Sequence, residues 1–218
     1  MRRRWTGPGA ALVGLVAWFT STPGPLAGQA PHWTAGVTVS GARFGGASAE
    51  ASPSPDGLRF LPYRPTFYGV FVERGSVIRV GLRLATGSPG VSLESGAPAG
   101  TGAAGRVRVV SDGAFNVGAL GVSVSVPVIR AANGAALRLG VGGHWEHWSA
   151  AGNPGRGLAG LDGLALVELP LGKHWLTQVS TGVGFDPRSP FAAEDLPNGF
   201  RPVGMWRVGF GAGVGLRW

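Results

Sequence analysis

The 218-residue chain contains no cysteine. This absence excludes a disulfide framework, a thiolate zinc site, a cysteine nucleophile and acylation as a lipoprotein. Charge is also scarce, since charged residues make up 14% of the chain and hydrophobic residues 44%. A chain with so few charges and so many large apolar groups does not stay unfolded in water. Its length fits one domain, although the 40 glycines and 17 prolines are an unusually large share.

The chain also lacks an apolar run that could cross a bilayer as a helix. The longest run, residues 10–19 with Gly14 inside it, is about ten residues long, whereas a spanning helix needs ~20. Three arginines, Arg2 to Arg4, precede this run, and small residues follow it near 27–30. The pattern predicts a signal peptide over residues 1–30, cleaved between 27 and 30, and a mature domain over residues 31–218.

The formal net charge of +8 includes the three arginines of this predicted signal peptide. The remaining basic residues are scattered along the chain. Nucleic-acid binding requires a basic stripe or patch, so we expect no nucleic-acid partner.

Apolar and small or polar residues alternate over unusually long segments. From Met205 to Trp218 the even positions are all apolar, while the odd positions after Met205 are glycine or arginine. Period two predicts a β-strand, and this one is longer than the five or six residues usual in soluble proteins. Comparable alternation predicts eight strands in all, the others at about 33–44, 65–73, 77–86, 116–128, 137–145, 161–171 and 174–185.

The connections between these strands alternate in length. Tight turns are expected at 74–76, 131–134 and 172–173, and long loops rich in Gly, Pro, Ser and Asp at 46–64, 87–115, 149–160 and 186–204. This asymmetry is typical of a transmembrane barrel with short periplasmic turns and long extracellular loops. The predicted fold is therefore an all-β, eight-stranded, antiparallel up-and-down barrel in which the eighth strand pairs with the first, because hydrocarbon does not tolerate open sheet edges.

Six aromatic residues near the strand ends stand at alternate positions that should face away from the barrel interior. We expect them to mark the two membrane interfaces, with Trp33, Trp175 and Trp218 on the turn side and Trp145, Phe185 and Trp206 on the loop side. A secreted soluble β-barrel is the alternative interpretation. It would turn the same apolar face inward around an apolar ligand.

Charged residues stand at the alternate positions that should face into the barrel. Because an unpaired buried charge is costly, we expect them to pair in a polar network in the lumen. An interior of eight strands is just wide enough for side chains, so no open pore is expected. The predicted members of the network are Arg79, Arg83, Arg138, Glu146, Asp162, Glu168, Gln178 and Arg207.

The alternating segments and the C-terminal residues resemble the small eight-stranded outer-membrane barrels of diderm bacteria, the outer membrane protein A/X-like superfamily. The resemblance covers residues 33–218, and Gly213, Leu216 and Trp218 match the signal read by the barrel assembly machinery. It implies export, insertion into the cell outer membrane by that machinery, and contact with outer-membrane lipid and lipopolysaccharide. We expect a monomer with a structural or surface-interaction role, in which the long loops contact lipopolysaccharide or host factors or serve adhesion.

Residues 144–149 hold the densest cluster of reactive side chains. His144 and His147 are three apart, which places them on opposite faces of a strand and argues against shared metal ligation. His147 and Ser149 share a face, so a base and a nucleophile could meet there. Some outer-membrane lipid A deacylases use a similar His-x-Ser pair, but the Asn that follows their Ser is missing here. We expect no enzyme, cofactor or metal, and a lipid-modifying hydrolase remains the alternative.

Overall fold

The computed structural model describes residues 32–52, 57–63, 65–95, 109–111, 113–150 and 153–218. The predicted signal peptide and its cleavage site lie outside these residues. All regular elements of the described part are β-strands. Within that part, no helix is long and apolar enough to cross a membrane.

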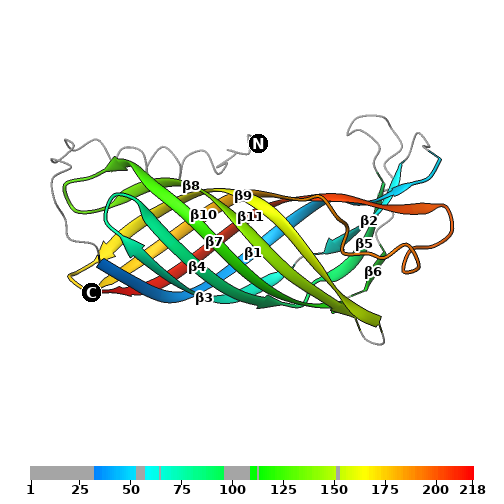
Figure 1. Cartoon of the computed structure of the whole chain (residues 1–218), viewed down its shortest axis with the longest axis horizontal. Coiled ribbons are helices and arrows are strands. Elements are labelled where there is room, and N and C mark those ends of the chain that lie inside the picture. Colours follow the sequence, from blue (N-terminus) through cyan, green and yellow to red (C-terminus); the bar gives the residue numbers. More distant parts are fainter. Residues whose placement is uncertain (1–31, 53–56, 64, 96–108, 112, 151–152) are drawn as a thin grey trace, which may run out of the picture.

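Eight antiparallel strands close into a barrel (Figure 1). In pairing order they are β1 (His32–Glu50), β11 (Phe200–Arg217), β10 (Trp175–Asp186), β9 (Asn153–Leu171), β8 (Ala136–Ala150), β7 (Phe115–Arg130), β4 (Arg79–Gly87) and β3 (Thr66–Gly75). The ring is complete because β3 pairs with β1. This arrangement confirms the predicted fold, including the pairing of the last strand with the first.

Tight turns join the barrel strands at one end, which we call the turn end. The turns carry Gly75, Gly134 and Gly172 with φ of 135°, 85° and 89°, a region that glycine adopts without steric cost. β1 begins and β11 ends here as well: Trp33 N donates to Trp218 O at 2.9 Å and Trp218 N to Trp33 O at 3.0 Å. The predicted turns are confirmed.

The opposite end, which we call the loop end, contains more strand than predicted. β1 continues to Glu50, β9 begins at Asn153 and β11 at Phe200, so most of the loop predicted at 149–160 was wrong. A second sheet, β2 (Leu58–Tyr63), β5 (Gly90–Ser95) and β6 (Val109–Ser111), also falls within predicted loops and lies beyond this end of the barrel (Figure 1). The Gly- and Pro-rich composition suggested loops, but strand formation depends on a neighbouring strand as well as on side-chain preference.

The apolar core lies inside the loop end. Trp148 is its centre, because the rings of Phe44 and Phe115 pack edge-on against it with centroids 6.1 and 5.7 Å away. We call this group the apolar cap. Its buried members are Phe44, Ala47, Leu61, Phe67, Phe115, Val117, Trp148, Leu158, Phe191, Leu196 and Met205.

Candidate functional site

The outer wall of the barrel is covered with exposed apolar side chains. Val141, Leu161 and Phe210 are 69%, 73% and 66% exposed. In a protein surrounded by water such side chains would form the core. We call this surface the apolar belt. It includes Val37, Val39, Val70, Leu84, Val122, Val124, Leu139, Val141, Leu161, Val179, Val183, Phe210 and Val214.

The six predicted interface aromatics all lie on the outer surface, with exposures from 40% at Trp33 to 63% at Trp218. On the loop side, Phe185 and Trp206 are register partners on β10 and β11. On the turn side, the Arg74 guanidinium lies 5.1 Å from the centre of the Trp33 ring. The positions suit amphipathic rings at two interfaces, and their role there stays a prediction.

Charged side chains fill the interior at the turn end. Arg79, 4% exposed, forms ion pairs with Glu168 and, at 3.1 Å, with Glu73. Gln178 Nε2 donates to Glu168 Oε1 at 3.5 Å, and Arg217 Nη2 lies 3.9 Å from Glu168 Oε2. We call these five residues the turn-end cluster. Three of them, Arg79, Glu168 and Gln178, belong to the predicted network. The other two, Glu73 and Arg217, were not among its predicted members.

Arg138 lies beside this cluster but is held by neutral oxygens. Its Nε donates to Ser125 Oγ at 3.1 Å, and its Nη2 donates to the carbonyls of Ser125 and Val77 at 2.9 Å each. Within the described residues it forms no ion pair. Partners of this kind could not be predicted from charge and parity.

A second group of charges lies further along the strands, under the apolar cap. Arg207 forms ion pairs with Glu146 and, at 3.2 Å, with Asp162. The ring of His144 lies between two carboxylates, with Nδ1 2.7 Å from Asp162 Oδ2 and Nε2 2.7 Å from Asp186 Oδ1. We call these five residues the loop-end cluster. Trp148 Nε1 links it to the apolar cap by donating to Glu146 Oε2 at 2.9 Å.

Sequence reasoning missed Asp186, which ends β10 and was assigned to a loop. The inward parity that it shares with Gln178 is the signal that could have found it, because the two residues are eight apart on one strand. His144 lies two residues before Glu146 and therefore shares its face of the strand, but it was not included in the predicted network.

The two clusters border a cavity of about 210 Å³ in the middle of the barrel. Ser40, Ser123 and Ser180 line it together with glycines of several strands. Arg83, the remaining member of the predicted network, also lines it and forms no ion pair with another described residue. Apolar side chains such as Phe67, Phe71 and Leu166 border the cavity too. The soluble-barrel alternative requires the apolar face of the strands to turn inward, whereas the apolar belt lies on the outer wall.

His147 and Ser149 are not arranged as a base and a nucleophile. The His147 ring stacks on Trp145, with centroids 6.0 Å apart. The Ser149 hydroxyl donates to the carbonyl of Asn116 at 3.4 Å. In the described structure no hydrogen bond joins the two side chains, so the geometry gives the hydrolase alternative no support.

No protein-family model and no curated protein matches the chain. Solved structures do match its fold. Neisserial surface protein A is 12% identical, with a TM-score of 0.52, over 85% of this chain and 96% of that one. The outer membrane protein OprG from Pseudomonas aeruginosa is 12% identical, with a TM-score of 0.51, over 86% of this chain and 95% of that one. The chain therefore has the fold of the small eight-stranded outer-membrane barrels.

Proposed function

We propose that this chain is an integral, monomeric barrel of a bacterial outer membrane that presents its loop end at the cell surface for contact with lipopolysaccharide or other acidic partners. The observation that carries the proposal is the apolar belt, which surrounds a polar interior. Apolar surface left in water costs about 25 cal/mol for each Å². Lipid removes that cost, and the closed ring leaves no open sheet edge in hydrocarbon.

The orientation follows from the position of the strand ends. β1 begins and β11 ends at the turn end. Insertion from the periplasm by the barrel assembly machinery leaves this end in the periplasm and sends the loop end across the membrane. The second sheet and the longer connections would then lie outside the cell.

The interior favours a surface role over conduction. Three buried side chains follow one another along β8: Arg138 beside the turn-end cluster, Glu146 of the loop-end cluster and Trp148 of the apolar cap. Each of these three side chains is 1% exposed. Buried side chains at these three levels favour a filled interior over an open water-filled path.

The loop end offers cationic groups to an acidic partner. Arg59 on β2, Arg188 after β10 and Arg201 on β11 are exposed. Guanidinium groups bind phosphate through paired hydrogen bonds. The phosphates of lipopolysaccharide, or an acidic glycan of a host surface, are therefore suitable partners.

Cell fractionation combined with gel electrophoresis of boiled and unboiled samples tests the location and the fold. We expect the protein in the outer-membrane fraction, with a folded band that changes mobility on boiling. A soluble protein without this shift would contradict the proposal.

The orientation can be tested with single cysteines, since the chain has none of its own. A membrane-impermeant maleimide added to intact cells is expected to label Glu194→Cys, an exposed loop-end position. The matched variant is Lys173→Cys in the turn after β9, where labelling is expected only after lysis. The reverse pattern would contradict the proposed orientation.

A further inference from the structure

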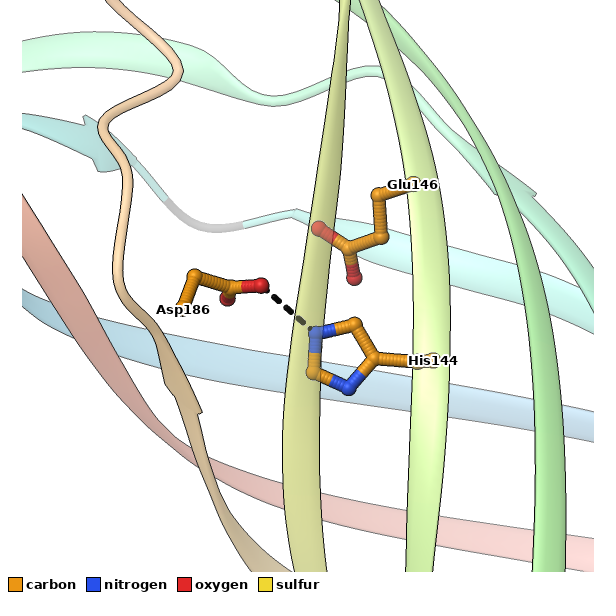
Figure 2. A group of neighbouring side chains, drawn as sticks. All are labelled: His144, Glu146 and Asp186. Carbon is orange, nitrogen blue, oxygen red and sulfur yellow. Dashed lines mark hydrogen bonds and ion pairs between the residues drawn. The ribbon is translucent and has the colours of Figure 1, made fainter.

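We propose that His144, Glu146 and Asp186 bind a divalent transition-metal ion inside the loop end of the barrel. One ligand atom from each residue lies within 4.8 Å of the other two, and all three side chains are buried. Figure 2 shows the imidazole and the two carboxylates turned toward one another. One imidazole nitrogen with two carboxylate oxygens suits ions such as Zn²⁺, Mn²⁺ or Fe²⁺.

The strand arrangement brings these residues together. His144 and Glu146 are two apart on β8 and share its inward face, while Asp186 ends β10 on the far side of β9. Gly160 of β9 lies between them. A Cβ at this position would be 2.6 Å from the His144 ring and 2.5 Å from Asp186 Oδ1. The missing side chain is therefore what allows the imidazole and the carboxylate to meet across β9.

His144 is oriented as metal-bound histidines usually are. Its Nδ1 lies 2.7 Å from Asp162 Oδ2, and this contact directs Nε2 toward Asp186. Histidine ligands commonly donate their second ring N–H to a carboxylate, which fixes the ring and its tautomer. Arg207 in turn holds Asp162, with Nη2 3.2 Å from Oδ1. The ligand thus has a supporting layer around it.

Asp186 supplies an independent observation that points to a ligand. Its side chain is 1% exposed, yet Oδ2 has no hydrogen-bond partner in the described structure. A buried carboxylate oxygen without a partner is costly and rare. A metal ion bound through Oδ2, or through both oxygens, would give this carboxylate the partner that it lacks.

The charge around the site also suits a divalent cation. The loop-end cluster holds three carboxylates, those of Glu146, Asp162 and Asp186, against the single guanidinium of Arg207. With a neutral imidazole, the form that binds metal, the cluster has two negative charges in excess. A divalent ion would balance them.

The site would connect the barrel wall to the apolar cap. His144 and Glu146 border the central cavity, which leaves space for an ion and its water next to the ligands. Asp186 begins the segment that contributes Phe191 and Leu196 to the cap. An ion held by β8 and Asp186 would fasten this segment, so the ion would act as a structural brace at the loop end.

Metal binding can be measured on the full-length mature protein, without a histidine tag, purified in detergent and stripped with a chelator. Equilibrium dialysis against Zn²⁺, followed by elemental analysis, is expected to show one equivalent per chain. We expect Asp186→Asn and His144→Gln to weaken binding at least tenfold. The matched control is His147→Ala on the outer face of β8, which is expected to bind as tightly as the unmodified protein. The mobility shift on boiling shows that each variant is folded.

Absence of saturable binding by the folded, unmodified protein would overturn the proposal. Equal binding by folded Asp186→Asn and His144→Gln would do so too. If these variants do not fold, Mn²⁺ added to the unmodified protein locates the ion by NMR line broadening. Broadening centred on the amides of His144, Glu146 and Asp186 supports the site, whereas broadening centred elsewhere overturns it.

Discussion

Arg138 shows how a buried charge can be held without an opposite charge. It is 1% exposed and donates to one hydroxyl and two carbonyl oxygens. Hydrogen bonds from a charged donor are stronger than those between neutral groups. The inward parity of Arg138 could be predicted, because it follows from period two on a single strand. Its partners could not, because Ser125 and Val77 belong to other segments of the chain.

We expect Arg138→Leu to lower the free energy of unfolding by about 1–3 kcal/mol, since the carbonyls of Ser125 and Val77 lose their donor. Urea unfolding in lipid vesicles measures this change. The control is Arg188→Leu, which removes an exposed arginine at the loop end and should change the unfolding free energy by less than about 0.5 kcal/mol. An unchanged midpoint for Arg138→Leu would contradict this description of the interior.

We expect Ser149→Ala to leave the lipid A of the producing cell unchanged. The Ser149 hydroxyl is engaged with a backbone carbonyl, and His147 is stacked on Trp145. Mass spectrometry of lipid A from cells with either form, or with neither, measures the outcome. Loss of an acyl chain only in cells that carry the unmodified protein would show that the residue is catalytic.

At the scale of the strands, small residues allow the narrow interior to close. A Cβ on Gly36 of β1 would lie 2.1 Å from the carbonyl oxygen of Val214 and 2.7 Å from the Phe71 ring. Gly118 of β7 is different, because a Cβ there would meet no atom within 4 Å. Both glycines lie within predicted strands, but only Gly36 stands where a side chain would collide with neighbouring atoms.

Gly36→Ala is expected to destabilise the barrel by about 1–3 kcal/mol, because the backbone atoms it meets can move only by shifting β11. Gly118→Ala is expected to be neutral or to stabilise by up to about 1 kcal/mol, since it restricts the unfolded chain. Refolding into lipid vesicles and urea unfolding compare the two variants. Equal stability of both would mean that close contact on the inner wall is unimportant.

The alternation of apolar and polar residues could be recognised wherever one face of a strand points out of the barrel and the other points into it. β11 was predicted to begin at about 205 and begins at Phe200. The error lies at the loop end, where both faces of a strand can contact protein and the alternation fades. β2, β5 and β6 were missed for the same reason. Asp186 was missed with them, because the contact between His144 and Asp186 depends on the register across β9.

At the scale of the whole molecule, charged side chains lie inside and apolar side chains outside, the reverse of the arrangement in a water-soluble protein. The described charges of the two clusters face inward, and the apolar belt faces outward with aromatic residues near both ends. Short turns at one end and the second sheet at the other give the barrel a direction. Together these features describe a molecule whose solvent is lipid around the wall and water at the ends.

Site-directed spin labelling tests this central claim most directly. Single cysteines at Val141 and Val183, on the apolar belt, and at Lys173, in a turn, would each carry a nitroxide in the vesicle-inserted protein. We predict that the two belt labels collide mainly with oxygen, which concentrates in lipid, and that the Lys173 label collides mainly with a water-soluble nickel chelate. Belt labels as accessible to the chelate as the turn label would contradict the account, because they would show a wall that faces water.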